Sequence, residues 1–432
     1  MFARFHNYIA LAWLTAAQCL PAQASDFQGA THLIPLDEDT IGYTKAQPDS
    51  AISRLQKKLE TGDASLPWDD KYGYLPALLK ELDIPDSSQM LVFSKTSLQR
   101  ERISPDNPRA LFFNDDVYIG WIPGAPLIEV SVADPKMGGV FYTIEQKKLD
   151  KPAFKRTDQC LECHASTKSM GVPGHLVRSF QTDEDGVIDL ASGTSQVNHR
   201  TPFEERWGGW YVTGTHGDQT HRGNLIGKAA FQKQAKEPNH SGNIEDLAKF
   251  INTGKYKSPG SDIVALMVFE HQTHMHNYIA RLNYEAMIMQ KTYGHVNYLR
   301  SIVDGFVRYL LFADEAPLTA KVSGSSSFQR DFEKLAVRDS KGRSLRDFDL
   351  AVRMFKYPCS YLIYSEAFNA LPSAVKEKVY AKMFNVLTSK DSSEAYNSLS
   401  NEDRRAILEI LAETKSDLPS AWKTAASQRS SS

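Results

Sequence analysis

The sequence predicts an α+β fold with a strand-rich N-terminal half, a mainly helical C-terminal half and a cysteine-containing segment at their junction. Between residues 90 and 145, short runs of β-branched and aromatic residues alternate with turn signals. After about residue 243, apolar residues recur instead at helical spacing. The chain has 432 residues, of which 41% are hydrophobic and 24% charged. This composition is typical of a folded globular protein.

The first 24 residues form a predicted signal peptide. After a positively charged start, residues 8–20 are apolar, and residues 22–24 read Ala-Gln-Ala, the pattern that signal peptidase cuts. A lipoprotein signal ending at Cys19 is a weaker alternative, because Gln18 stands where a small residue is expected. No later apolar run approaches membrane-spanning length. We therefore expect a periplasmic or secreted protein with no integral membrane segment.

The strand-rich region covers residues 25–150. A short helix is expected at residues 76–82, and five strands follow at residues 90–93, 110–113, 117–121, 127–132 and 140–144. Turn signals separate several of these runs, including Asn-Asp-Asp at residues 114–116 and Pro-Gly-Ala-Pro at residues 123–126. The strands are therefore expected to pair with short connections.

The helical region covers residues 241–422. Its longest pattern, residues 262–313, predicts two helices or one kinked helix. Shorter helices are expected at residues 345–355, 360–371, 373–387 and 402–414. Ser400, with Asp403 three residues later, provides a cap for the last of them. The serine-rich residues 423–432 are expected to form a disordered tail. The two halves are as consistent with one integrated unit as with two domains.

Charge and cysteine content exclude two classes of protein. Lys and Arg total 50 against 52 Asp and Glu, which gives a net charge of −2. A general nucleic-acid binder would show a basic excess, so no nucleic-acid partner is expected. Four cysteines in a chain of this length exclude a disulfide scaffold. Cys359 stands alone among aromatic and apolar residues and is expected to be a small buried side chain.

The segment 151–240 contains the motif Cys160-Leu161-Glu162-Cys163-His164. In an exported protein this pattern predicts one covalently attached haem c. The two-residue spacer places both thiols along one edge of the macrocycle, where they form thioethers with its vinyl groups. The adjacent His164 then becomes the proximal iron ligand. Iron binds a neutral imidazole nitrogen, while the other ring nitrogen usually donates to a carbonyl.

The motif has three alternative interpretations. A structural zinc site needs four ligands, and a set of Cys160, Cys163, His164 and His175 would place two adjacent ligands awkwardly. A thioredoxin-like redox pair normally sits in a βαβ unit, and no such pattern precedes the motif. The third alternative is a chance cysteine pair. Haem attachment remains the leading interpretation.

The motif resembles the haem-attachment sequence of c-type cytochromes. The chain is not similar to a small class I cytochrome c, in which the motif lies near the start of a compact helical domain. The wider pattern, including Trp207-Gly208-Gly209-Trp210 and Glu270-His271-Gln272, is similar to large exported monohaem proteins without a firm functional assignment. This resemblance implies haem binding and no particular reaction.

The second axial position decides what such a haem can do. A strong His or Met ligand favours electron transfer, whereas an open position permits chemistry on small molecules. His175 can reach the far side of a haem through a glycine- and proline-rich loop, whereas Met170 would need an almost fully extended chain. His271 and Met275 are the other candidates, because helical spacing places them toward the interior. A buried polar network or a separate metal site are the alternatives for residues 270–277.

Residues 207–217 combine aromatic side chains with glycine and could approach a flat cofactor closely. An ordinary strand-and-turn core explains the same pattern. His216 and His221 lie in or after this segment. Four arginines could pair with haem propionates or simply lie at the surface: Arg178, Arg200, Arg206 and Arg222.

The leading functional prediction is an exported monohaem c-type cytochrome that transfers single electrons. Its partner would be a redox protein or a small-molecule electron donor or acceptor. The first alternative is a haem-dependent oxidoreductase or peroxidase with an open distal site, with His271, His274, His175 or His216 as acid or base. The second alternative is a haem-based sensor or a subunit of a redox complex. The sequence specifies neither a catalytic residue nor a substrate.

Overall fold

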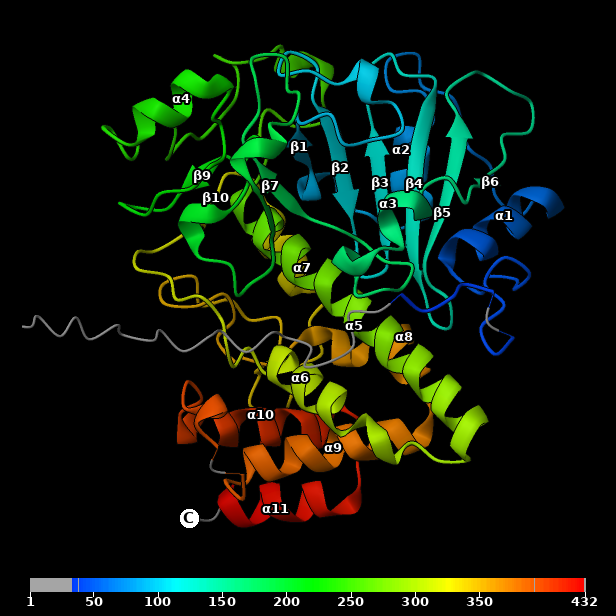
Figure 1. Ribbon diagram of the computed structural model, residues 1–432, viewed down its shortest axis with the longest axis vertical. Coiled ribbons are helices and arrows are strands. Elements are labelled where there is room, and N and C mark those ends of the chain that lie inside the picture. Colours follow the sequence, from blue (N-terminus) through cyan, green and yellow to red (C-terminus); the bar gives the residue numbers. More distant parts are fainter. Residues whose placement is uncertain (1–32, 38, 392, 431–432) are drawn as a thin grey trace, which may run out of the picture.

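The computed structural model describes residues 33–37, 39–391 and 393–430. The predicted signal peptide lies outside these residues. Within them, the main sheet has six antiparallel strands in sequence order (Figure 1). They are β1 (Met90–Val92), β2 (Arg109–Phe113), β3 (Val117–Trp121), β4 (Leu127–Asp134), β5 (Gly138–Glu145) and β6 (Lys155–Arg156). All five predicted strands are therefore present, and the predicted α+β class is confirmed.

Two smaller antiparallel pairs lie outside the main sheet. They are β7 (Arg178–Phe180) with β8 (Thr194–Gln196), and β9 (Gly214–Thr215) with β10 (Ser323–Gly324). The second pair joins segments more than one hundred residues apart in the sequence. It therefore ties the middle of the chain to its C-terminal half.

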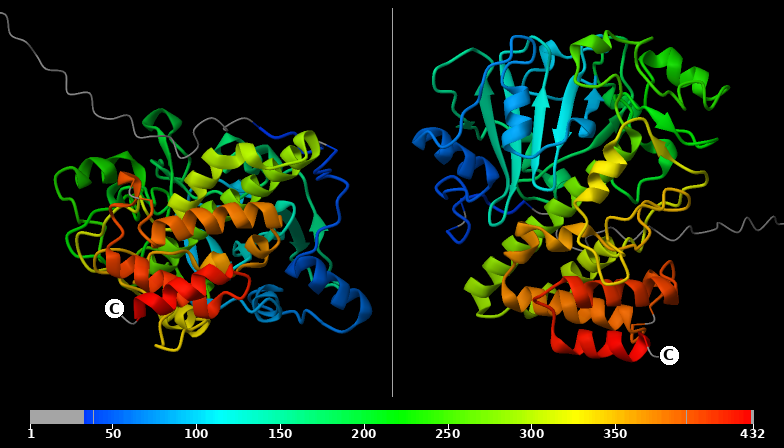
Figure 2. Two further views of the ribbon diagram at one scale, coloured as in Figure 1. Left: turned by 90° about the horizontal axis from the view of Figure 1, so that it is seen from below. Right: turned by 180° about the vertical axis from the view of Figure 1, so that it is seen from behind.

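The sheet has two covered faces. One carries helices α1 (Ala51–Thr61) and α2 (Leu75–Glu81), whose apolar residues share a buried cluster with the strands (Figure 2). The other faces the long helix α5 (Ile263–Tyr293), which crosses the molecule diagonally between the sheet and the helical half (Figure 1). Asp262 caps α5 through backbone N–H groups, and Gly294 ends it in the left-handed conformation.

Four helices of the C-terminal half lie on the other side of α5 from the sheet: α6 (Arg300–Leu310), α9 (Ser373–Leu387), α10 (Asn401–Thr414) and α11 (Ser420–Ser430) (Figure 1). The other two, α7 (Phe328–Lys334) and α8 (Glu366–Asn369), flank α5. The ring of Phe328 in α7 lies 5.5 Å from that of Phe113 in β2, and Glu366 in α8 accepts from Arg54 in α1. Two short helices precede α5 in the chain, α3 (Leu161–His164) and α4 (Gly227–Gln234). Among the described residues, no helix has the length and apolar character needed to span a membrane.

Several helix predictions agree with the structure. The 262–313 pattern forms two helices, α5 and α6, and the predicted 373–387 helix is α9. The capping box predicted for α10 is present, because Ser400 Oγ accepts from the Asp403 N–H and the Asp403 carboxylate accepts from the Ser400 N–H. Short-range signals therefore located these helices well.

Other helix predictions were wrong. Residues 345–355 form turns, because Leu350 adopts a positive φ of 58° and the ring of Phe348 stacks on Phe355 at 5.3 Å. The predicted 360–371 helix is a 3₁₀ turn (Tyr361–Tyr364) followed by the single turn of α8. The tail expected to be disordered from residue 423 is instead helical in α11, which is held by the buried ring of Trp422.

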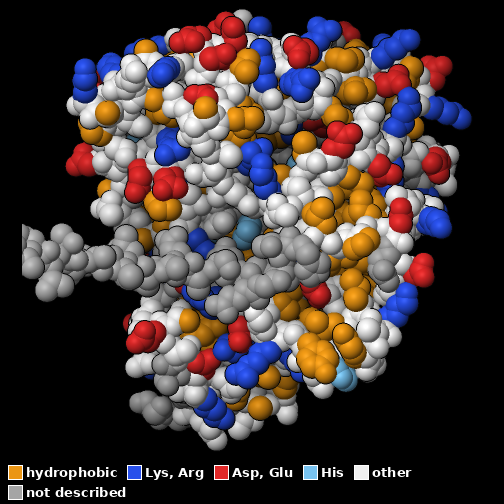
Figure 3. Space-filling model, viewed as in Figure 1, with side chains coloured by type: hydrophobic (Ala, Val, Ile, Leu, Met, Phe, Trp, Pro, Cys, Tyr) orange, Lys and Arg blue, Asp and Glu red, His pale blue; other side chains and the backbone are white. Residues whose placement is uncertain are grey.

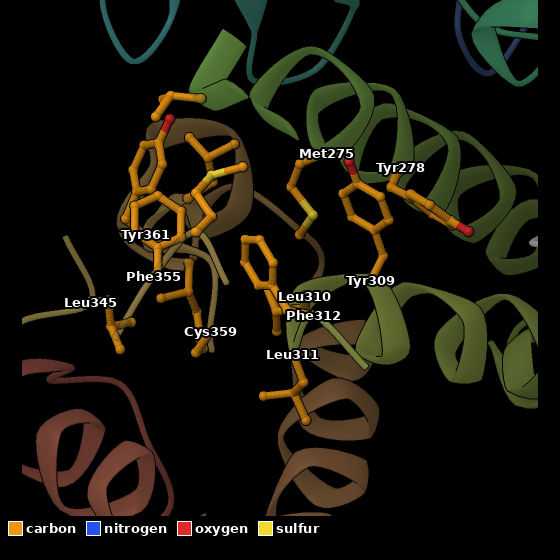
Figure 4. Packing of buried hydrophobic residues seen from close by; sticks show 14 of the residues in the cluster. Met275, Tyr278, Tyr309, Leu310, Leu311, Phe312, Leu345, Phe355, Cys359 and Tyr361 are labelled. Carbon is orange, nitrogen blue, oxygen red and sulfur yellow. The ribbon is translucent and has the colours of Figure 1, made fainter. Parts of the chain in front are cut away.

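The largest apolar cluster joins α5 and α6 to the turn-rich segment that follows α7. Figure 4 shows Met275 of α5 pointing toward Tyr309 and Phe312, with Cys359 on the neighbouring segment. Cys359 is a free thiol with 0% exposure, which agrees with the expected small buried residue. This cluster holds α5 in place beneath the sheet.

Candidate haem-attachment site

The predicted motif folds as a single helical turn. The N–H groups of Cys163 and His164 both donate to the carbonyl of Cys160, at 3.2 and 2.9 Å. Cys160 is half-buried and Cys163 exposed, and both are free thiols. Burial raises the pKa of Cys160 to about 11, so this thiol is protonated near neutral pH. Zinc binds thiolates, and the described residues hold no cluster of three or more metal-ligating side chains.

His164 presents one ring nitrogen to a ligand and keeps the other engaged. Its Nδ1 lies 2.9 Å from the carbonyl oxygen of Gly174, so Nδ1 carries the proton and donates it. Burial lowers the pKa of the imidazole, which keeps the ring neutral. Nε2 is therefore the nitrogen left for a metal, the arrangement in which a metal-binding histidine is normally held.

The loop from His164 to Gly174 is closed by its own hydrogen bonds. Gly174 N–H donates to the His164 carbonyl at 2.8 Å, and Ser169 Oγ donates to the same carbonyl at 3.0 Å. Ser166 and Ser169 form a reciprocal capping box around the 3₁₀ turn Thr167–Ser169. The loop therefore brings Gly174 back to His164, so that the Gly174 carbonyl accepts a hydrogen bond from the His164 imidazole.

Glycines of β5 let this loop approach the sheet. Gly139 N–H donates to the Pro173 carbonyl at 2.8 Å, and a Cβ on Gly139 would lie 3.0 Å from the nitrogen of Gly174. Gly138 has φ of 72°, and a Cβ there would lie 2.6 Å from the same Pro173 oxygen. Larger residues at these positions would push the loop, and with it the accepting carbonyl, away from His164.

The sheet beside the motif carries aromatic, small and charged residues. Tyr118, Ser131 and Phe141 form one cross-strand row, and the ring of Phe141 lies 4.9 Å from that of His164. Glu129, in the next row, forms an ion pair with Arg109 of β2 at 3.0 Å. Both charges act on Cys160 and His164. A Cβ on Gly120 would meet the Arg109 guanidinium at 2.6 Å.

The part of this face that α5 leaves uncovered lies next to the cysteines. Glu129, Ser131 and Thr143 alternate along β4 and β5 and are each only half-buried. Figure 3 shows that this side of the molecule is hollowed over the upper part of the sheet, with charges of both signs around it. One half-buried and one exposed thiol, a neutral imidazole with Nε2 available and an adjoining half-buried sheet surface fit a covalently held haem.

His175 lies close to His164, on the Nδ1 side of its imidazole ring. It follows Gly174, whose carbonyl holds Nδ1, so its backbone is on the side of the imidazole opposite to Nε2. Its ring is 5% exposed and lies 4.4 Å from Tyr118 and 5.9 Å from Phe141. Neither ring nitrogen has a hydrogen-bond partner within the described chain. This position does not favour His175 as a ligand on the far side of the haem.

The two candidates on α5 are engaged elsewhere. His271 Nδ1 lies 2.8 Å from His199 Nδ1, and its Nε2 lies 2.8 Å from Ser360 Oγ, so both ring nitrogens are used. Met275 is fully buried in the apolar cluster of Figure 4. Met170 is also buried, and its carbonyl accepts from Arg281. The buried polar network considered for residues 270–277 describes this part of α5 best.

Residues that the sequence did not single out complete the surroundings of His164. His276 Nδ1 lies 2.8 Å from the hydroxyl of Tyr118, and its ring lies 6.2 Å from that of His175. Asn277 bonds the backbone of His175 on both sides. His164, His175 and His276 thus share one region, although His276 is far from the other two in the sequence. The register of the main sheet and the position of α5 bring them together, and neither can be predicted from a local sequence motif.

Residues 207–217 serve mainly as core. Trp207 is fully buried, and its Nε1 donates to Glu270 at 3.0 Å, while Arg206 forms a buried ion pair with the same carboxylate. Trp210 Nε1 donates to the carbonyl of Arg178 at 2.9 Å. This matches the ordinary core explanation of the aromatic–glycine pattern.

The remaining candidates lie apart from the motif. His216 and His221 pack against each other at 4.7 Å, next to Phe203. Arg200 lies over Tyr309 and pairs with Asp314, and the N–H of Arg222 donates to the carbonyl of Arg206. The guanidinium of Arg178 lies over the ring of Phe180 at 4.3 Å and donates to Thr194 Oγ1 at 3.1 Å.

Comparison with known proteins found no matching family model, no matching curated protein and no matching solved structure.

Proposed function

We propose that this protein is an exported monohaem c-type cytochrome, with haem c held by Cys160 and Cys163 and ligated by His164. The observation that carries the proposal is the hydrogen bond from His164 Nδ1 to the Gly174 carbonyl, directly after a helical turn with two free thiols. This arrangement supplies a fixed tautomer and a free Nε2 beside the attachment points.

Each part of the chain has a role in this proposal. Cys160 and Cys163 anchor the group, and the Gly174 carbonyl orients His164. Phe141 packs on the imidazole, and the Arg109–Glu129 pair provides charge beside the motif. When bound, haem supplies one-electron redox chemistry. We propose single-electron exchange with a redox protein or a small molecule, in the periplasm or outside the cell.

A second candidate function is a haem-dependent oxidoreductase with an open distal position. The specific observation in its favour is the placement of the three distal candidates. His271 has both ring nitrogens engaged, and Met275 lies in the apolar core. His175 directly follows Gly174, whose carbonyl accepts from His164 Nδ1. None of these three offers an obvious ligand on the Nε2 side. A haem without a strong sixth ligand can bind small molecules.

The test is production in a host with cytochrome c maturation machinery. We expect a red protein whose haem survives denaturation, and loss of that haem in the Cys160→Ala/Cys163→Ala double variant. Cys359→Ala is the matched control and should keep its haem. A colourless wild-type protein with no mass adduct would refute the proposal. The ferric spectrum then separates the candidates: a low-spin haem insensitive to CO and cyanide supports electron transfer, and a high-spin haem that binds them supports the oxidoreductase.

A further inference from the structure

The side chain of Asn277 on α5 holds the backbone of His175 from both directions. His175 N–H donates to Asn277 Oδ1 at 2.7 Å, and Asn277 Nδ2 donates to the His175 carbonyl at 2.7 Å. Asn277 is 1% exposed, so both bonds are shielded from water. A paired, buried amide of this kind fixes a backbone segment more firmly than a single solvent-exposed bond.

Gly174 lies in direct contact with the same amide. A Cβ at residue 174 would lie 2.2 Å from Asn277 Oδ1, so only glycine leaves room for this approach. Gly174 also makes two bonds with His164, one through its N–H and one through its carbonyl. A continuous chain of contacts therefore runs from α5 through Asn277 and Gly174 to the imidazole of His164.

We propose that Asn277 is a positioning residue that fixes the Gly174 carbonyl against Nδ1 and thereby sets the basicity of His164 as an iron ligand. This inference rests on the proposed function, since it concerns the same site. It assigns α5 a role beyond packing: the helix that joins the sheet to the helical half also holds the backbone behind the proximal ligand.

The direction of the effect follows from the hydrogen bond. A carbonyl that accepts from Nδ1–H increases electron density on the imidazole and makes Nε2 a stronger donor. A stronger donor stabilises ferric over ferrous iron, which lowers the reduction potential. Releasing the Gly174 carbonyl should therefore raise the potential, without removing either cysteine or the ligand itself.

Asn283 provides a matched control. It lies on the same helix, is 5% exposed, and its Nδ2 donates to the Lys136 carbonyl at 3.1 Å. Asn277→Ala and Asn283→Ala each remove a buried amide of α5 that bonds a backbone carbonyl. Only the first touches the segment behind His164. A purely structural role would give the two variants similar properties.

The experiment is redox titration of the haem-loaded protein. We expect Asn277→Ala to shift the ferric–ferrous equilibrium toward ferrous by about threefold to tenfold, where tenfold corresponds to about 59 mV. Asn283→Ala should leave it unchanged. In Gly174→Ala, the added methyl group would clash with Asn277 Oδ1, so this variant should shift the ferric–ferrous equilibrium in the same direction. It therefore tests the proposal if Asn277→Ala does not fold. Potentials equal to that of the wild type in the folded variants would overturn the inference.

A second readout separates this inference from the proposed function. In protein without haem, ¹⁵N NMR of the His164 ring reports which nitrogen carries the proton. We expect the Nδ1–H form in the wild type and in Asn283→Ala, and a mixture of tautomers in Asn277→Ala. A colourless wild type would refute the cytochrome assignment, whereas an unchanged tautomer in Asn277→Ala would refute the positioning role.

Discussion

The hydroxyl oxygen of Tyr118 lies 2.8 Å from Nδ1 of His276, which joins the central strand β3 to α5 beside the ring of His175. Burial keeps the pKa of Tyr118 well above its usual value and lowers that of His276 to about 3. Tyr118 therefore donates to a neutral imidazole. The same hydroxyl accepts from Gln272 Nε2 at 3.0 Å, so Tyr118 of the sheet is hydrogen-bonded to two residues of α5.

Tyr118→Phe should lower the free energy of unfolding by about 1–3 kcal/mol, because it leaves His276 and one Gln272 bond unpaired in the interior. Denaturant unfolding measures the change. Tyr298→Phe is the control, because Tyr298 is 65% exposed and its change should have little effect. Equal stability of the two variants would contradict the role given to the Tyr118–His276 bond.

His175→Leu should leave the free energy of unfolding unchanged or raise it by up to about 2 kcal/mol. A buried imidazole with no partner for either nitrogen is costly, and leucine fills similar space without polar atoms. The haem spectrum should not change, whereas His164→Leu should alter iron ligation. Absorption spectra and denaturant curves test both statements. A changed sixth ligand in His175→Leu would show instead that His175 binds iron.

The sequence predicted local features of this protein well. The strands of the main sheet are rich in β-branched and aromatic residues and are separated by strong turn signals, so local composition located them. The motif at residues 160–164 predicted an imidazole with one ring nitrogen donating to a carbonyl and the other left free, but not the helical turn in which the motif folds. The strands and the motif both depend on residues close together in the chain.

The surroundings of the site depended on tertiary structure. From Ile263 to Tyr284, α5 is buried on every side, so helical spacing could not distinguish an interior face. Helical spacing therefore points to His271 and Met275 and not to His276 and Asn277, the residues of α5 that lie near the loop behind His164. Phe141 and Tyr118 reach the site through the strand register, which no local pattern specifies.

Asp116 should make stability depend on pH. Burial raises its pKa to about 7, and its Oδ1 has no hydrogen-bond partner in the part of the chain that is described. A raised carboxyl pKa means that the folded state binds more protons than the unfolded one. This contribution to stability should therefore fall, by at most about 1.4 kcal/mol per pH unit, as pH rises from about 4 to 7.

Asp116→Asn should remove that contribution. The difference in unfolding free energy between the variant and the wild type should grow across the same pH window, with the variant relatively more stable at pH 7 than at pH 4. Asp218→Asn, an exposed carboxylate, serves as the control and should follow the wild-type pH profile. Parallel profiles for Asp116→Asn and the wild type would contradict the buried, high-pKa carboxyl.

Met275→Leu should leave both the haem spectrum and the reduction potential unchanged, because the Met275 side chain is fully buried and points toward Tyr309 and Phe312 (Figure 4). The exchange conserves volume, so the free energy of unfolding should change by less than about 1.5 kcal/mol. Met354→Leu, in the same apolar cluster and equally buried, is the matched control. If Met275→Leu alone converted a low-spin haem to a high-spin one, Met275 would be an iron ligand. The helix would then have to turn this side chain out of the cluster when haem binds.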